Sequence, residues 1–388
     1  TGASSGHGKF LPRVGVAYRW GDNTVIRGGY GQSSDPRPFI DFRNAYPVVN
    51  AWAMPSLSFN GVTNAFLPVT TFRQGLVNTS VAPDLNAGVL LLPANSGTTT
   101  YPKTPMRNVI HSFNLILERQ LPWKLKGSVG YVGTRAPGQM GFININAGAP
   151  GTGTAGRPLF TKFGIQSDIN EILPYGTTSY DSLQSTLVRH WASSIFGMAY
   201  TWSKAINYAD NDGGPRIQYM PLKQLNKGLA GYDRTHNLQI YGVYDLPFGK
   251  GQEYANKGAV AHILGGFQLS GVASIMSGTP IFVQQSNGFN LNAAGSGQMP
   301  DQVVTNVSIP GGIGVGNPYF DRNAFAIVNI PSGSTQRFGT AGRNVLRGPG
   351  YFNIDMGLFK TFSITENLKL QFKAEAINVL NHPNFANP

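Results

Sequence analysis

Strict two-residue alternation constrains this chain of 388 residues more than any other feature. In the stretches 352–358 and 368–375, every second residue is apolar, and the residues between them are polar, charged or glycine. Successive side chains of a β-strand point to opposite faces, so such a period places one face in an apolar medium and the other in a polar one. The pattern predicts strands with one wet face.

The same pattern recurs along the chain and predicts ten strands. They are expected near 12–20, 24–32, 107–118, 123–134, 179–190, 194–204, 234–246, 263–278, 351–362 and 367–379. Most are longer than the five or six residues that are usual in globular proteins. A tilted strand that crosses a bilayer needs about 9 to 11 residues, which fits these lengths.

The connections alternate between short and long. Short turns are expected at Gly21–Asn23, Gln120–Pro122, Trp191–Ser193 and Ser363–Glu366, with one longer connector, Pro247–His262, on the same side. The segments between these hairpins are 33–106, 135–178, 205–233 and 279–350, and they are rich in Gly, Pro, Asn and Thr. Loops this long are abnormal inside a compact soluble domain. We therefore predict an antiparallel transmembrane β-barrel with short periplasmic turns and long extracellular loops.

Composition excludes several other classes of protein. No apolar run approaches the roughly 18 residues of a membrane-spanning helix, and the absence of Cys excludes disulfide scaffolds, thiol catalysis and Cys-bound zinc. The net charge of +12 is compatible with an anionic partner, but no block of five or more Lys or Arg exists. Nucleic-acid binding is not expected.

Aromatic side chains gather near the ends of the expected strands, as in the interfacial girdles of outer-membrane barrels. The residues assigned to these girdles are Tyr18, Trp20, Tyr131, Trp191, Trp202, Tyr244 and Tyr351. Each of them also has the simpler explanation that aromatic residues are common in strands. The pattern across both hairpin ends favours the girdles and predicts outer-membrane lipid as a partner.

Charged residues on the polar faces form a candidate lumenal band. Its members are Arg27, Lys124, Lys126, Lys369, Lys373 and Glu375. One hypothesis is that the basic groups pair with acidic groups of a lumenal plug. The alternative is that charges avoid lipid, where Arg or Lys at the midplane costs about 2 to 4 kcal/mol.

Motifs for chemistry are weak. GTGTAG at Gly151–Gly156 lacks the preceding strand of a dinucleotide site, and GASSG around Ser4 lacks the strand-to-helix turn of a nucleophile elbow. Asp210 and Asp212 offer oxygen ligands for Ca²⁺, but turn chemistry explains them as well. We expect no catalytic residue, no cofactor and no metal ligand set, and the chain is not expected to be an enzyme.

The strand count also predicts that the chain is part of a larger barrel. The first expected strand descends into a short turn and the tenth ascends from one, so both flanks lie among external loops. Complete bacterial barrels have an even strand number and normally periplasmic termini. An odd number of strands is therefore expected to be missing on each flank, including a final strand, and residues 1–388 form a single barrel domain.

Several stretches together resemble the Oar-like branch of TonB-dependent outer-membrane transporters. They are FLPRVGVAYRWGDNTVIRGGYG (Phe10–Gly31), RQLPWKLKGSVGYVGTR (Arg119–Arg135), SYDSLQSTLVRH followed by AYTWSKAI, GYDRTHNLQIYGVYDLPFGKG (Gly231–Gly251), and the long stretch Gly342–Pro388. Asn237 stands where a basic residue is common. The resemblance touches all ten expected strands, whereas the long loops match weakly.

This resemblance implies a barrel of about 22 strands with a lumenal plug. It further implies an N-terminal carboxypeptidase-regulatory-like domain and energy coupling through the TonB complex; neither the plug nor that domain is expected within these residues. The implied function is uptake of a large or scarce ligand, with a saccharide or a peptide as candidates, across the bacterial outer membrane. An adhesion or structural barrel without active transport stays open, as does a secreted soluble all-β protein.

Overall fold

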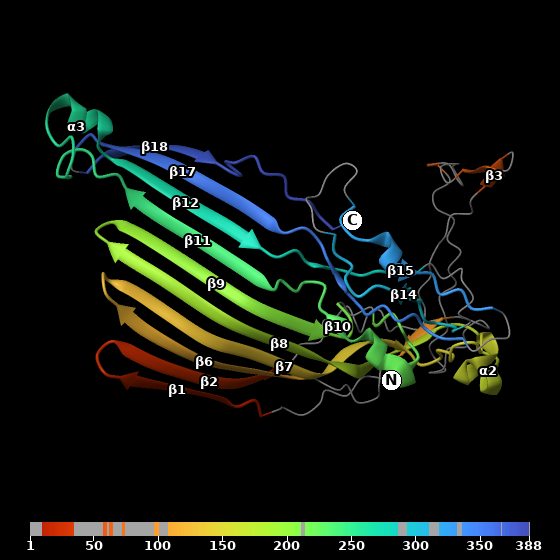
Figure 1. Cartoon of the computed structure of the whole chain (residues 1–388). Helices are drawn as coiled ribbons and strands as arrows, with labels where there is room; N and C mark the ends of the chain where they lie inside the picture. The colour runs from red at the N-terminus through yellow and green to blue at the C-terminus, as the bar shows by residue number, and fades with distance from the viewer. Residues whose placement is uncertain are drawn as a thin grey trace.

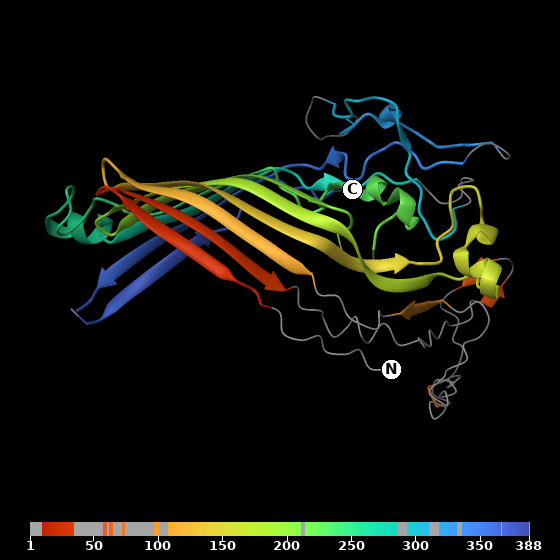
Figure 2. The ribbon, with the colours of Figure 1, turned by 90° about the horizontal axis from the view of Figure 1, so that it is seen from below.

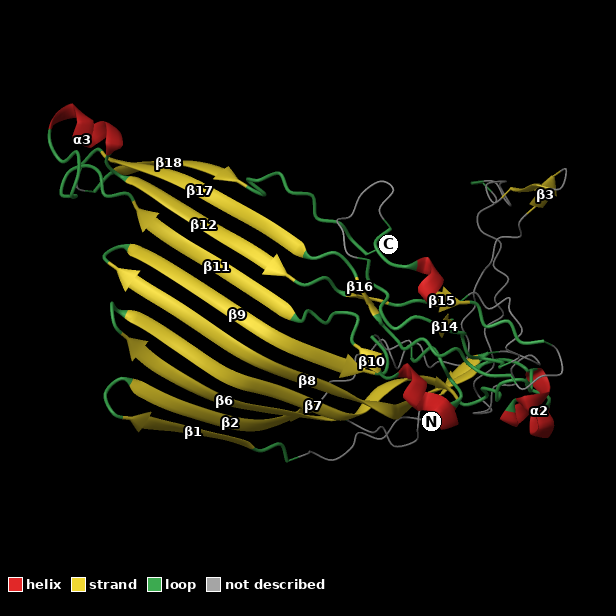
Figure 3. Ribbon diagram, in the orientation of Figure 1, coloured by secondary structure: helices red, strands yellow, loops and turns green. Residues whose placement is uncertain are grey.

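One large antiparallel sheet dominates the computed structural model (Figures 1 and 3). The structure describes residues 10–34, 57–59, 62–64, 72–73, 97–100, 108–210, 214–285, 293–309, 318–331, 336–365 and 367–387. Ten long strands pair in the order of the chain and form a curved surface, which we call the wall (Figure 2). Its strands are β1 (Arg13–Trp20), β2 (Thr24–Ser34), β6 (Val109–Leu121), β7 (Leu125–Asn144), β8 (Ile169–Trp191), β9 (Ser194–Asn207), β11 (His236–Asp245), β12 (Phe267–Met276), β17 (Tyr351–Ser363) and β18 (Lys369–Ala376). The ten predicted strands are confirmed.

The smaller elements lie at the two ends of the wall. Near the long loops are β3 (Leu57–Phe59), β4 (Val62–Asn64), β5 (Thr98–Thr100), η1 (Thr154–Gly156), α2 (Pro158–Phe163), η2 (Met220–Asn226), β10 (Gly228–Leu229), β13 (Pro280–Ile281), β14 (Asp301–Gln302), η3 (Arg322–Ala324), β15 (Phe325–Ala326) and β16 (Leu346–Arg347). Helix α3 (Gly258–Leu264) lies at the opposite end (Figure 1). No described helix is long and apolar enough to cross a membrane.

The register sorts the wall residues into an apolar face and a polar face. Leu269 of β12 pairs with Leu358 of β17, and Leu115 of β6 pairs with Tyr131 of β7, so these residues share the apolar face. The residues between them form the other face, where Gln268 donates a hydrogen bond to Asp245. Many apolar-face side chains are exposed, and they include Val14, Val16, Leu115, Leu370 and Phe372. Exposed rows of this kind fit an apolar medium around the wall.

Charges on the apolar face occur at its two margins. Arg189 lies near the inner turn of β8, and Asp181 lies eight residues away toward the long loops. At about 3.4 Å per residue this interval is about 27 Å along the strand, and a tilt of about 40° reduces it to about 20 Å of height. The strand therefore presents a charge-free band that approaches the roughly 25 Å apolar band of outer-membrane barrels.

The short connections at the inner end agree with the prediction, with one shift. Trp123 and Lys124 were predicted to alternate within a strand, but both have positive φ, 58° and 59°, in the turn before β7. Lys124 is therefore a turn residue and not a member of a strand face. The predicted turn Ser363–Glu366 includes Glu366, which lies outside the described residues.

The prediction of a continuous external loop over 135–178 is wrong at both ends. β7 continues to Asn144 and β8 begins at Ile169, so this hairpin rises beyond its neighbours (Figure 1). Its ladder shifts register between Pro137 and Met140, where Gly138 has a φ of 78°. A glycine at a positive φ is the usual way to accommodate such a bulge.

Introducing a charged side chain on one face of the wall tests which face is in contact with lipid. Leu115 lies on the apolar face, and its neighbour Asn114 lies on the polar face of the same strand. We expect Leu115→Arg in the full-length protein to destabilise the wall by about 1 to 4 kcal/mol, because the guanidinium would enter the apolar band, where the cost of a cation rises from the interface to the midplane. Denaturant titration in lipid vesicles measures this change. Asn114→Arg is the matched control, and an equal loss for both variants contradicts the assignment.

Candidate functional site

The long loops at the outer end of the wall fold onto one another and form what we call the cap. Three clusters of buried apolar side chains are found among the described residues, and all of them lie in or beside the cap. The first joins Ile217 of the loop 205–233 to Met299 and Phe338 of the loop 279–350. The second contains Tyr175 and Tyr208, whose rings meet edge to face at 6.3 Å. These two clusters join segments that are distant in sequence, and the third, around Ala324, lies within the loop 279–350, so the cap has cores of its own.

Arginine side chains fasten the cap to the wall. Arg343 is almost fully buried and donates to the backbone and side-chain oxygens of Asn207, at 3.1 and 2.6 Å, where β9 ends. Its other terminal nitrogen lies 2.5 Å from the carboxylate of Asp210. Asp210 also accepts the backbone N–H of Gly231 at 2.6 Å. One guanidinium thus joins the last long loop to the end of a wall strand.

Two further arginines of the cap pair with carboxylates: Arg157 within the loop between β7 and β8, and Arg347 at the base of the cap. Arg157 donates to the backbone oxygen of Asn146 and pairs with Asp168 at 2.8 Å. Arg347 pairs with Asp233, a carboxylate that is almost fully buried and that also accepts the backbone N–H of Ala205. Buried carboxylates need such partners, because an unpaired charge would carry a large desolvation cost.

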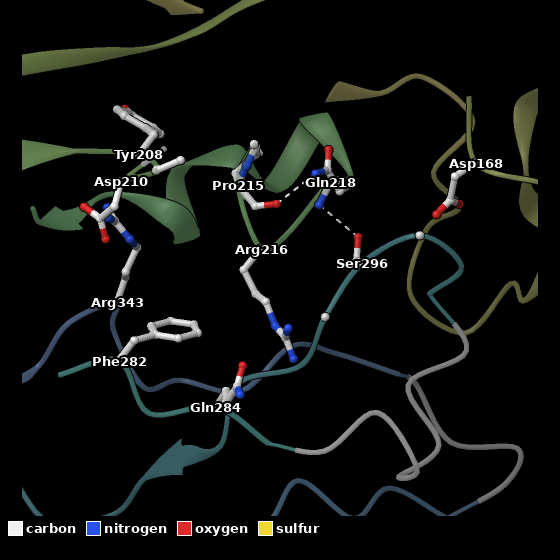
Figure 4. A pocket seen from close by; sticks show the side chains of 14 residues that line it. Asp168, Tyr208, Asp210, Pro215, Arg216, Gln218, Phe282, Gln284, Ser296 and Arg343 are labelled. Carbon is white, nitrogen blue, oxygen red and sulfur yellow. Dashed lines mark hydrogen bonds and ion pairs between the residues drawn. The ribbon is translucent and has the colours of Figure 1, made fainter. Parts of the chain in front are cut away.

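Between these anchors lies a chamber of about 650 Å³ (Figure 4). Its lining combines charged, amide, hydroxyl and aromatic side chains, which include Asp168, Tyr208, Asp210, Arg216, Gln218, Phe282, Gln284, Ser296 and Arg343. The Arg216 side chain points into this space toward Gln284 (Figure 4). Its volume falls in the range of small-molecule sites.

Neighbouring side chains hold the chamber in place. The Gln218 side chain accepts the backbone N–H of Asn144 at 2.9 Å and donates to the carbonyl of Pro215 at 2.9 Å. The backbone N–H of Gln218 in turn donates to the Ser296 hydroxyl at 2.9 Å. Strand β7 and two loops therefore fix Gln218, so this side of the chamber is preformed.

Burial changes the electrostatics of the chamber. It lowers the pKa of Arg216 by disfavouring the charged guanidinium, so that an anion brought into the chamber would be attracted in a weakly screened setting. At Asp210, burial acts to raise the pKa, but the hydrogen bonds from Arg343 and Gly231 outweigh it and the pKa is lowered. Asp210 is thus held as a carboxylate.

The acidic pair considered for Ca²⁺ has a different role in the described residues. Asp210 bonds to Arg343, Gly231 and Asn207, whereas Asp212 lies outside the described residues. No group of three potential metal ligands is found in the part of the chain that the structure describes. Ser4 of the GASSG stretch also lies outside that part, and GTGTAG contains η1 in a cap loop.

The register places the predicted lumenal residues. Arg27, Lys126, Lys369, Lys373 and Glu375 lie in polar-face rows of the wall. Arg27 forms an ion pair with Glu118 of the next strand at 3.1 Å. These residues share a face across separate parts of the wall, and contact with a plug stays a prediction.

Six of the seven predicted girdle residues lie on the apolar-face side, and one does not. Tyr18, Trp20, Tyr131, Trp191, Trp202 and Tyr244 fall in or beside its rows. Trp191 and Tyr244 lie 6.2 Å apart at the inner margin. Tyr351 pairs with Met276 in a polar-face row, so its placement in the girdle is wrong.

Sequence reasoning missed the arginines of the cap. Arg343 and Arg347 stand within the stretch from Gly342 that carries the family resemblance, and Asp233 stands within the quoted GYDRTH stretch. The presence of Asp233 in one family-like stretch and of Arg347 in another was a signal that could have suggested an ion pair between them. Arg216 had no comparable signal, because it lies in a loop without a recognisable pattern.

Comparison with known proteins gives one family. A family model described as an outer membrane beta barrel domain matches residues 1–388. No curated protein sequence matches the chain. Among solved structures, the chain is similar to the outer membrane transporter YddB from Escherichia coli, with 10% identity and a TM-score of 0.45 over 92% of this chain and 35% of that one.

Two further solved structures are similar to the same extent. The ferripyoverdine receptor of Pseudomonas aeruginosa, bound to ferripyoverdine, shares 11% identity with a TM-score of 0.42, covering 97% of this chain and 29% of that chain. The siderophore receptor PirA from Acinetobacter baumannii shares 7% identity with a TM-score of 0.43, covering 91% and 35%. The chain therefore spans about a third of the length of these proteins.

The buried anchor Arg343 can be compared with an exposed one. Arg343→Met removes one donor from Asn207 and the paired cation from Asp210, and we expect the cap to lose about 1 to 3 kcal/mol of stability. Arg337, which bonds Asp301 through two nitrogens at 2.7 Å each but is half exposed, provides the control. Arg337→Met is expected to cost about 1 kcal/mol or less. Amide hydrogen exchange of the cap measures both, and equal protection in the two variants contradicts the anchor role.

Acid should loosen the cap. Hydrogen bonds from Arg337 lower the pKa of Asp301, and the pKa of Asp210 is also lowered in the folded chain. A carboxyl with a depressed folded pKa contributes stability above its unfolded pKa of 3.8, and this stability is lost as the pH falls through the folded value. Exchange measured from about pH 6 to about pH 3 should show rising cap exposure below about pH 4. Unchanged cap protection at the acid end contradicts this assignment.

Proposed function

We propose that this chain, which belongs to the outer membrane beta barrel domain family, forms part of the barrel of a TonB-dependent receptor that takes up a large or scarce ligand. Its place is the bacterial outer membrane. The observation that carries the proposal is the polar chamber that buried ion pairs hold at the outer end of the wall. A ligand that arrives from outside the cell would reach a chamber in that position before it reached the lumen.

A larger barrel is part of the proposal. β1 and β18 form the two margins of the wall, and each has one side without a partner strand in the described sheet. Unpaired backbone groups are not tolerated in hydrocarbon. We therefore propose that both margins pair with further strands of the full-length protein, giving about 22 strands around a plug.

The cations on and beside the polar face are an argument for a plug in the lumen. Lys126, Lys369 and Lys373 lie on this face near the inner turns, and Lys124 lies in a turn beside them. We propose that these cations pair with acidic groups of the plug, whose release would follow contact with the TonB complex. Arg27 contributes less, because Glu118 already neutralises it.

The chamber suits a ligand rich in hydrogen-bonding groups. Arg216, Gln284 and Ser296 offer donors, and Phe282 and Tyr208 offer aromatic faces. Saccharides and peptides carry the hydroxyl, amide and carboxylate groups that such side chains bind. We propose these two classes as candidate ligands.

Uptake by cells that make the full-length protein tests the proposal. Labelled pools of oligosaccharides and of peptides serve as probes, and we expect accumulation of one pool that a protonophore abolishes. Arg216→Gln should lower this uptake about tenfold, because a charge-assisted hydrogen bond is worth about 1.5 to 3 kcal/mol. Arg337→Gln, outside the chamber lining, is the matched control.

Three results contradict the proposal in whole or in part. Uptake that is insensitive to the protonophore indicates a passive barrel. Surface binding without accumulation favours an adhesion or structural barrel instead. Equal uptake by Arg216→Gln and the control removes the chamber from the ligand path even if transport is observed.

A further inference from the structure

The connector between β11 and β12 differs from the other inner connections, because it contains helix α3 (Gly258–Leu264) (Figure 1). Sequence reasoning predicted a strand from residue 263 onward; residues 263 and 264 instead belong to the helix, and β12 begins at Phe267. An inner turn needs only a few residues. The additional chain builds a separate element at the inner margin of the wall.

One lysine shows on which face of the wall the helix ends. Lys360 pairs with Phe267 of β12 and Phe372 of β18, in the row that continues the apolar face through Leu358. Its ammonium lies over the rings of Phe267 and Phe362, at 4.5 and 4.8 Å from their centroids. The side chain therefore projects toward the membrane side.

The same ammonium binds the end of α3. Lys360 Nζ donates to the backbone oxygens of His262 at 3.1 Å and Ile263 at 2.8 Å, and also to that of Gly265. These are carbonyls at a helix C-terminus, which lack partners within the helix and attract cations. Lys360 is buried by this contact. The C-terminal end of α3 is thus fixed on the apolar-face side of the wall.

The helix then leaves an apolar surface open beside the membrane band. Val260, Ile263 and Leu264 are 52%, 65% and 42% exposed, and Ala261 is buried. Their spacing of three and four residues places them on one side of a helix. Tyr254 of the same connector is also exposed and contacts the ring of Phe248 at 6.2 Å.

Charge near α3 favours an anionic surface. Lys250 and Lys257 are exposed on the connector, and Glu253 is the acidic residue between them. The cation of Lys360 is occupied by backbone oxygens. Amphipathic elements with apolar residues on one face and flanking lysines lie in the interface between headgroups and acyl chains.

We propose that α3 is an interfacial anchor that binds the periplasmic leaflet of the outer membrane, with Val260, Ile263 and Leu264 in the acyl-chain boundary and Lys250 and Lys257 at anionic phospholipid headgroups. The anchor surface continues the apolar face, so one bilayer covers both. It positions the inner margin of the wall in the membrane independently of any ligand.

Site-directed spin labelling of the full-length protein tests this anchor. Ile263→Cys and, as the matched control, Asn256→Cys are labelled with a nitroxide in vesicles of phosphatidylethanolamine with and without phosphatidylglycerol. We expect the ratio of oxygen to aqueous nickel-reagent accessibility to be severalfold higher at residue 263 than at residue 256. Both positions are exposed, so the labelled variants keep the fold.

A second measurement distinguishes anionic lipid from water and from a protein partner as the surroundings of α3. Lys250→Gln together with Lys257→Gln should abolish any gain in the residue 263 ratio that phosphatidylglycerol produces. Equal accessibility ratios at residues 263 and 256 would show that α3 is surrounded by water, and this result overturns the proposal. A label at 263 that neither reagent reaches overturns it in favour of a protein partner or a second copy.

Discussion

Pairing of every backbone N–H and C=O group across the bilayer is the constraint on which the rest of this structure depends. Hydrocarbon offers no alternative partner, so each strand must stay in continuous register with its neighbours. A slip of one residue would turn every lipid-facing side chain inward. In the described ladders of the wall, register shifts occur only between Pro137 and Met140. That point lies above Asp181 and Arg135, beyond the charge-free band, where loops and water can satisfy an interrupted ladder.

Wall and cap therefore obey different rules of packing. In the wall, the large apolar side chains face outward and the bilayer supplies their partners, so the described strands need no buried cluster within the band. In the cap, water surrounds the loops, and Ile217, Tyr175 and Ala324 anchor three separate cores. Polar anchors such as Arg343 join the two parts at the level where the medium changes. The chamber lies at this boundary because rigid strands and folded loops meet there.

This difference explains how much the sequence could predict. Alternation predicted all ten wall strands, since lipid imposes it along each one. It did not predict the upper parts of β7 and β8, because Pro137, Gly138 and Pro174 read as loop residues and the alternating environment ends below them. Ile263 and Leu264 form a short apolar run, whose period cannot distinguish a strand from a helix. The chamber depends on contacts between distant loops, which no local pattern encodes.

Charges on the apolar face follow from the same constraint. At the outer margin Arg135 donates to Asp181 at 2.7 Å, and Tyr131 also donates to that carboxylate, so that the charges neutralise each other. At the inner margin Arg189 lies over the ring of Trp191 at 5.2 Å. Arg135, Asp181 and Arg189 thus each have a local partner that lowers the desolvation cost of the charge. Because unpaired charges would be expensive one row deeper, these pairs fix the height at which the wall lies in the membrane.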